Sequence, residues 1–301
     1  MSGPRALRRL AAALLPERPL RLLRTLWHRS QACDPRRLLL HRAHRRLNAG
    51  AAADEIVLRP GLCLTIDPRA REPFEWFCFR SPEMVRELNG FLAGGADRHR
   101  LLDVGACHGL FALAFTQGRP GAAALAIEPS PVAWEILQAN VRSNPGARVT
   151  PVQAAVGAAS GTVRMRYSWH HLEALPPAAE GQDGPETLSI PLRTLDGLCD
   201  ELAFRPDILK VDVEGYEISV LRGAQRILRQ DRPLLFLEIH PQRIRELGGS
   251  PAELWAVLAE AGYRPLGPAG APLDAAELAA VDTTARLTCA PADGPVLEPP
   301  R

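Results

Sequence analysis

Short apolar runs alternate with amphipathic stretches from residue 100 onward. The apolar runs predict buried strands at residues 101–104, 123–127, 149–153, 208–213 and 234–239. Apolar residues at helical spacing predict helices near residues 108–117, 131–143, 216–229 and 251–262. Strands and helices that alternate in this way indicate an α/β fold, in which helices cover both faces of a parallel sheet. Ligands bind such sheets at the carboxyl ends of the strands.

The segment before this region has a different pattern. Residues 51–99 predict a strand pair at 56–58 and 62–66, and then a helix that begins near Ser81. Serine is a favourable N-cap, and the proline that follows it suits the first helical position. Four aromatic residues lie within 74–79. They form either a core plug beneath the next domain or one wall of a substrate pocket.

Glycines and prolines in residues 156–193 interrupt the alternation of strands and helices. This predicts a hairpin and a loop that covers the ligand site at the carboxyl ends of the strands. Residues 286–289 are a further candidate strand before a loose tail. We divide the chain into a basic Arg-rich helical arm (1–50), an N-terminal subdomain or pocket lid (51–99), a core (100–267) and an Ala/Pro-rich C-terminal segment (268–301).

The arm carries most of the excess positive charge. Residues 1–50 hold twelve arginines against Glu17 and Asp34, although the net charge of the whole chain is only +2. One interpretation is peripheral attachment to an anionic membrane surface or to nucleic acid. The other is a solvated or packed helical extension. Trp27 is the only aromatic residue in the arm, which favours the second interpretation, because nucleic-acid binding also uses interleaved aromatic residues.

Composition narrows the function classes. The 301 residues are 46% hydrophobic and 23% charged, which is typical of a soluble globular protein. Lys210 is the only lysine, so a phosphate-binding loop that ends in GK[ST] is excluded. The six cysteines form no CxxC pair, which argues against a zinc cluster or a dense disulfide framework. We expect a cytoplasmic protein, because no apolar run has the length of a signal-peptide core or a membrane span.

The clearest chemical signal is the segment LLDVGACHGL at residues 101–110, a strand that runs into a glycine turn and then a helix. A nicotinamide fingerprint GxGxxG would need glycines at Cys107 and Leu110, so an oxidoreductase is disfavoured. The spacing DxGxxxG instead suits a nucleoside ligand without a pyrophosphate. Gly105 would let the backbone approach such a ligand, and the helix N-terminus offers amides to a carboxylate.

The position of a second acidic residue supports a site for a nucleoside ligand. Glu128 ends the second strand, twenty-five residues after Asp103. In nucleotide-binding folds an acid at about this position hydrogen-bonds the ribose hydroxyls. The alternative is that Glu128 stabilises the N-terminus of the helix that follows Pro129.

Several motifs in unbroken order between residues 100 and 265 resemble the FkbM family of S-adenosylmethionine-dependent methyltransferases. They are LLDVGACHGLFALAFT, AIEPSPVAWEILQANV, VQAAVGAASGTVRM, TLDGLCDEL, ILKVDVEGYEISVLRGAQRIL and RPLLFLEIHP. The DVEGYE block and the downstream EIH are the family-specific part. The resemblance implies a Rossmann-like, seven-stranded class I methyltransferase sheet, to which the arm adds an N-terminal helical extension. It also implies methyl transfer, usually to a hydroxyl of a sugar, polyketide or similar metabolite.

The resemblance assigns the cofactor-binding residues. It places Asp103, Gly105 and Gly109 along the methionine portion of S-adenosylmethionine, Glu128 at the ribose, Ala154 at the adenine and Asp212 beside the methyl-transfer site. These roles agree with the chemistry of the cofactor. Its sulfonium is cationic, so a site edged by Asp103, Asp212 and Glu214 favours it electrostatically.

A hydroxyl acceptor needs a group that takes its proton. His240 lies at the carboxyl end of its predicted strand, two residues beyond Glu238, and is our first candidate for the general base. Glu214 is the competing candidate, and a structural His240 would merely hydrogen-bond the loop. Asp212, Glu238 and His240 are ligand types that suit Mg or Mn, but their spacing does not establish a site, and we assign no metal.

Lys210 falls in a strand predicted to be buried on both faces, where an ammonium group needs a partner. Alternation of side chains puts Lys210 and Asp212 on one face of the sheet. Glu238 lies nearby if the next strand in sequence is adjacent. We expect Lys210 to be a structural partner of Asp212 or Glu238, not a nucleophile.

Two rival functions rest on other features. The basic arm suggests methylation of nucleic acid, but the chain lacks both an Asn/Asp-Pro-Pro-Tyr/Phe segment and a Pro-Cys pair. A non-catalytic scaffold could keep the fold and the binding residues alone. Because the acids and glycines of the expected site are all present, the sequence favours an enzyme that acts on a small-molecule hydroxyl acceptor.

Overall fold

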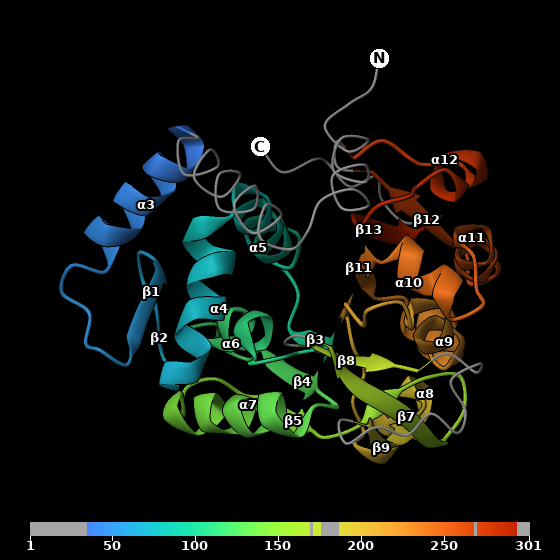
Figure 1. The fold of residues 1–301 in the computed structure, drawn as a ribbon, viewed down its shortest axis with the longest axis horizontal. Helices are drawn as coiled ribbons and strands as arrows, with labels where there is room; N and C mark the ends of the chain where they lie inside the picture. The colour runs from blue at the N-terminus through green and yellow to red at the C-terminus, as the bar shows by residue number, and fades with distance from the viewer. Residues whose placement is uncertain (1–34, 169–170, 176–186, 268–269, 294–301) are drawn as a thin grey trace, which may run out of the picture.

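The computed structural model describes residues 35–168, 171–175, 187–267 and 270–293. Its centre is a seven-stranded sheet with the order β12-β13-β11-β10-β3-β4-β5 (Figure 1). The strands are β3 (Arg100–Val104), β4 (Ala123–Ile127), β5 (Val149–Val152), β10 (Ile208–Val211), β11 (Leu234–Ile239), β12 (Tyr263–Leu266) and β13 (Ala285–Pro291). Neighbouring strands from β5 to β11 are parallel, whereas β13 is antiparallel to β11 and β12. The Rossmann-like seven-stranded α/β fold predicted from the sequence is confirmed.

Helices bury both faces of this sheet. Leu101 in β3 packs with α5 (Pro82–Gly94), α6 (Leu110–Thr116) and α7 (Pro131–Ser143). The next residue, Leu102, faces the other core cluster, with α8 (Leu195–Glu201), α9 (Glu217–Arg222) and α11 (Pro251–Glu260). Because successive side chains of a strand point to opposite faces, a strand covered on both sides reads as a continuous apolar run. This is why β3, β4, β10 and β11 are predictable from the sequence.

Of the last two strands, β13 contains the candidate strand at residues 286–289, and β12 was not expected. β12 was not predicted, because Arg264 and Pro265 interrupt its apolar pattern; it lies at the edge of the sheet, where a proline is tolerated. β13 inserts between β11 and β12, so the sheet continues to Pro291, past residue 267 where the sequence division ended the core. The C-terminal segment therefore supplies an internal strand.

The helix expected at residues 216–229 is interrupted. α9 ends at Arg222, and a π-helical turn follows at Ile227–Asp231. A Cβ atom added to Gly223 would overlap the carbonyl oxygen of Gly157. The break thus lies where the chain at Gly157 passes against the end of the helix.

The N-terminal part packs against one side of the sheet (Figure 1). It contains α3 (Pro35–Leu47), β1 (Glu55–Arg59), β2 (Leu62–Thr65), a 3₁₀ turn (Pro68–Ala70), α4 (Arg71–Glu75) and a π-helical turn (Trp76–Arg80) before α5. The Ser81 hydroxyl accepts a hydrogen bond from the Met84 amide, as the predicted N-cap requires. Phe74 and Phe79 are buried in the core and Trp76 is 43% exposed, so most of the aromatic stretch packs as a core plug.

A second, four-stranded sheet occupies the interrupted region. It has the order β6-β9-β7-β8 and consists of β6 (Ala155–Val156), β7 (Gly161–Ser168), β8 (His171–Ala174) and β9 (Thr187–Arg193). β7 pairs with β8 and with β9 in antiparallel fashion, so the region contains the predicted hairpin.

The described part of the basic arm is α3, whose last turn carries His44, Arg45 and Arg46. The interpretation of the arm as a membrane or nucleic-acid contact rests mainly on residues 1–34, which lie outside the described residues. Among the helices that the structure describes, none combines the length and the apolar character needed to cross a bilayer. Short α10 (Pro241–Glu246) and α12 (Ala275–Ala279) complete the fold.

Candidate active site

The turns that follow β3 and β10 touch each other at the carboxyl edge of the sheet. Gly105 has φ +77°, and a Cβ atom added to it would overlap the carbonyl oxygen of Asp212. The Asp212 amide also donates to the carbonyl of Val104, at 3.0 Å. The chain leaves β3 toward β4 on one side and returns through β10 on the other, so this contact lies at the switch point where open α/β sheets bind ligands.

Asp103 is a buried acid beside this contact. Its side chain is 1% exposed, and among the described residues neither carboxyl oxygen accepts a hydrogen bond of normal geometry, although the amide of Ala112 is close enough to lower its pKa. Burial raises the pKa of Asp103 to about 6, although the neighbouring charge of Lys210 lowers it. A buried acceptor without a partner is costly unless a ligand supplies the donor.

The single lysine has the structural partner expected for it. The Lys210 ammonium lies 3.4 Å from Oδ2 of Asp212 and 4.6 Å from the centroid of the Phe111 ring. Of the two acids predicted as partners, Asp212 is therefore the one that contacts it. The pKa of Lys210 is raised, because the nearby carboxylates outweigh the burial that lowers it, and the group is a fixed cation.

The glycine turn and Glu128 are joined by hydrogen bonds. Gly109 has φ +88°, and a Cβ atom added there would come within 2.5 Å of Cδ1 of Leu137. Oε2 of Glu128 accepts from the Cys107 amide and Oε1 from the Ser130 amide, each at 2.8 Å. Burial raises the pKa of Glu128 to about 7. The carboxyl keeps free acceptor positions, since each carboxylate oxygen can accept more than one hydrogen bond.

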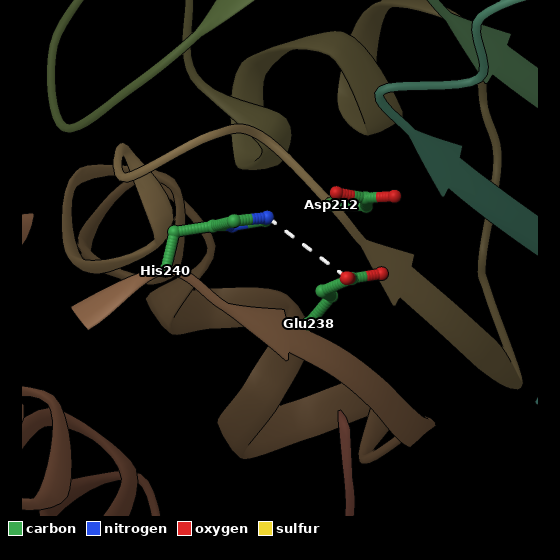
Figure 2. A group of neighbouring side chains, drawn as sticks. All are labelled: Asp212, Glu238 and His240. Carbon is green, nitrogen blue, oxygen red and sulfur yellow. Dashed lines mark ion pairs between the residues drawn. The ribbon is translucent and has the colours of Figure 1, made fainter. Parts of the chain in front are cut away.

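His240, the last residue of EIH, lies at the end of β11 as expected, and four carboxyl groups surround it. Its Nδ1 is 2.8 Å from Oε1 of Glu217, and its Nε2 is 3.5 Å from Oε2 of Glu214. Nε2 is also 3.9 Å from Oε1 of Glu238 (Figure 2). Burial by itself would lower the pKa of His240. The hydrogen bond with Glu217 and the charge of Glu214 outweigh burial and raise the pKa to about 9.

Glu238 is held by residues that no sequence motif marks. Arg286 of β13 donates to Glu238 at 2.6 Å through Nη2 and to Glu87 of α5 at 2.5 Å through Nε. Burial, Asp212 and Glu87 raise the pKa of Glu238 to about 8, and Arg286 opposes that rise. No local pattern marks Arg286 or Glu87. Arg286 reaches both Glu87 and Glu238 only because β13 inserts beside β11.

Asp212, Glu238 and His240 come close enough to be considered as a metal centre (Figure 2). One ligand atom from each lies within 4.8 Å of the other two, and the donor set suits Mg or Mn. However, Arg286 already pairs with Glu238, and Lys210 already pairs with Asp212. The carboxylates thus have protein cations as partners, and we assign no metal to them.

The predicted site residues divide into two groups. Asp103, Gly105 and Asp212 meet at the β3–β10 contact, and Glu214 and His240 meet beside it at the end of β10 and β11. Glu128 joins the first group through Cys107. Ala154 follows β5 and is 3% exposed in a core cluster, so its expected place beside the adenine remains a prediction.

Comparisons with known proteins identify the family of the chain. The sequence profile described as the methyltransferase FkbM domain matches residues 103–265. The methyltransferase sdnD of Sordaria araneosa is 30% identical over 153 residues, which cover 41% of this chain and 59% of that protein. The hexuronic acid methyltransferase AglP of Haloferax volcanii is 32% identical over 142 residues, 45% of this chain and 52% of that protein.

A crystal structure of the methyltransferase FkbM from Methylobacillus flagellatus KT aligns with a TM-score of 0.37 and 21% identity, over 57% of this chain and 43% of that one. The chain spans little more than half the length of the two curated relatives. The matched profile, in contrast, begins at Asp103 and ends at Pro265, and so contains both turns of the site. This chain belongs to the FkbM methyltransferase domain family.

Proposed function

We propose that this chain transfers a methyl group from S-adenosylmethionine to a hydroxyl group of a small molecule, such as a sugar or a polyketide-type metabolite. One observation carries the proposal: buried Asp103 and the Asp212 turn meet at the switch point of the sheet, beside a histidine that can take a proton. Membership of the FkbM family supports it. The match to a hexuronic acid methyltransferase favours a sugar as the acceptor.

The described residues fit the cofactor. The orphaned oxygens of Asp103 can accept from an ammonium group, and the free acceptor positions of Glu128 can accept from ribose hydroxyls. A cationic sulfur is favoured near Asp212 and Glu214, which lie at the same edge of the sheet. When bound, S-adenosylmethionine supplies an electrophilic methyl group.

The residues of the chain then have two tasks. They hold the acceptor oxygen close to the methyl carbon, and most of the acceleration comes from this positioning. They also remove the hydroxyl proton, for which Nε2 of neutral His240 is the acceptor. Glu214, at 3.5 Å from Nε2, stabilises the imidazolium that forms.

Calorimetric titration tests the cofactor assignment. We expect S-adenosylmethionine to bind with micromolar affinity and Glu128→Ala to weaken binding about 10- to 100-fold, the effect of losing hydrogen bonds to a charged group. Glu135→Ala, in which an exposed carboxyl on α7 is lost, is the matched control and should bind as the wild type does.

NADH is titrated in parallel, because the failed glycine positions predict that it does not bind. If NADH binds and S-adenosylmethionine does not, the cofactor assignment is wrong. If neither binds, a scaffold role replaces the enzyme.

Chelation tests the decision to assign no metal. Because Arg286 and Lys210 already pair with Glu238 and Asp212, we expect methyl transfer to be unchanged after exhaustive treatment with EDTA and unchanged again when Mg²⁺ or Mn²⁺ is added. A rate that disappears with EDTA and returns with either cation would show that Asp212, Glu238 and His240 bind metal.

A further inference from the structure

We propose that Glu217 is the positioning residue for His240, holding the imidazole so that Nδ1 carries a hydrogen and Nε2 faces the acidic edge of the sheet. The inference rests on the proposed function, in which Nε2 takes the proton of the acceptor hydroxyl. Glu217 is the last residue of the DVEGYE block, but neither the resemblance nor the comparisons give it a role.

The carboxyl of Glu217 is held through one oxygen, while its Oε2 is buried without a hydrogen-bond partner among the described residues. Glu217 lies in the first turn of α9 and is 0% exposed. Its Oε1 is 2.8 Å from Nδ1 of His240 and also accepts the amide of Gly215, at 2.9 Å. One buried oxygen therefore joins the turn after β10 to the histidine at the end of β11.

This contact selects the tautomer of the ring. An ionised carboxyl can only accept hydrogen bonds, so Nδ1 of His240 must be the donor. In the neutral ring Nε2 is then left with a lone pair. Nε2 points toward Glu214 and Glu238, at 3.5 Å and 3.9 Å, on the side where Asp212 lies (Figure 2). The nitrogen that can take a proton thus faces the site, and the other is held by Glu217.

The backbone of the turn is shaped for this contact. Glu214 has φ +50° and Gly215 has φ +100°, two successive left-handed residues. A Cβ atom added to Gly215 would overlap Cβ of Arg243, in α10 just after His240. The two segments are therefore in contact without room for a side chain at Gly215, and left-handed residues outside glycine cluster at functional sites.

Charged groups surround His240 on every element that contacts it. Glu217 belongs to α9, Glu214 to the turn, Asp212 to the end of β10 and Glu238 to β11. Two cations pair with these acids: Arg286 of β13 is bound to Glu238, and Lys210 of β10 to Asp212. Glu217 is the single carboxyl of this set that hydrogen-bonds the ring. Its charge makes Nε2 a stronger base, and its position fixes the direction in which that base acts.

The experiment combines Glu217→Gln with ¹⁵N NMR of histidine and pH–rate profiles. In Glu217→Gln the amide oxygen can still accept from Gly215 and Nδ1, but the negative charge is lost. We expect the titration midpoint of His240 to move to lower pH. On the high-pH plateau, where the ring is neutral in both proteins, kcat should fall at least about tenfold because the base is weaker, while KM for S-adenosylmethionine stays the same. A group with a merely structural role would not move the midpoint.

Three comparisons complete the experiment. Glu217→Asp keeps the charge and should leave the midpoint near that of the wild type. Glu260→Gln, an exposed carboxyl on α11 paired with Arg229, is the matched control and should change neither kcat nor midpoint. The wild-type spectrum, assigned by its loss in His240→Gln, should show Nδ1–H as the neutral tautomer, and this holds even if a Glu217 variant fails to fold.

The outcomes separate the two proposals. An unchanged midpoint and kcat in Glu217→Gln, or an Nε2–H tautomer in the wild type, overturns the role of Glu217 while methyl transfer stands. If the wild type methylates no hydroxyl at all, the proposed function fails, and the NMR titration still decides whether Glu217 controls His240.

Discussion

His240→Gln is expected to lower kcat for methyl transfer by about 10²- to 10⁴-fold, the usual contribution of a positioned general base. Glutamine is close to histidine in size, but its amide cannot take a proton at neutral pH. Binding of S-adenosylmethionine should persist, because Asp103, Gly105 and Glu128 belong to neighbouring strands and remain in place. The loss should therefore appear in kcat and not in the affinity for the cofactor.

Single-turnover kinetics with a saturating acceptor, together with calorimetry, measures both quantities. His99→Gln is the matched control: His99 is exposed and precedes β3 at the opposite end of the sheet, so it should behave as the wild type does. Retention of the full rate in His240→Gln would contradict the assignment of the base. Glu214, whose carboxyl lies 3.5 Å from Nε2, would then be the group to test.

The rate of methyl transfer by the wild type is expected to rise with pH. The neighbouring carboxyl groups hold the pKa of His240 near 9, so most of the ring is charged at neutral pH in the free protein. The base form accumulates as pH rises, and the wild-type rate should rise with it. A cation bound beside Asp212 lowers the pKa of the histidine, which brings the rise to lower pH in the complex.

Much of the site was predictable because its residues lie at strand ends. Asp103, Gly105 and Glu128 follow directly from apolar runs, and parallel strands end at the same edge of a sheet. The pairing of Lys210 with Asp212 follows from alternation along a single strand. Such inferences need only local pattern and the parallel arrangement.

The rest depends on contacts that no local pattern states. Arg286 reaches Glu238, 48 residues earlier in the chain, only because β13 enters the sheet antiparallel beside β11. A candidate strand at residues 286–289 does not say which neighbour it takes. Glu217 looks from sequence like a favourable acid in the first turn of a helix, and its burial against His240 depends on how tightly the turn at Gly215 folds.

Gly105→Ala is expected to abolish S-adenosylmethionine binding at concentrations that saturate the wild type. Two effects combine at this position. A left-handed conformation costs an alanine about 1–2 kcal/mol, and the new methyl group would in addition overlap the backbone carbonyl of Asp212. A carbonyl held in a sheet turn cannot rotate away as a side chain can, so the β3 and β10 turns must separate.

Gly121→Ala isolates the first effect, the cost of the left-handed backbone. Gly121 has φ +80°, close to the +77° of Gly105, but a Cβ atom added there meets nothing within 4 Å, and the residue lies at the other end of β4 from the site. The free energy of unfolding of Gly121→Ala should fall by about 1–2 kcal/mol, the cost of the left-handed backbone alone, and the variant should bind the cofactor normally. Thermal unfolding and calorimetry on the two variants therefore separate strain from overlap. Equal losses of stability and equal cofactor binding in both would show that the contact between the β3 and β10 turns does not shape the site, and the placement of the cofactor at this edge would have to be abandoned.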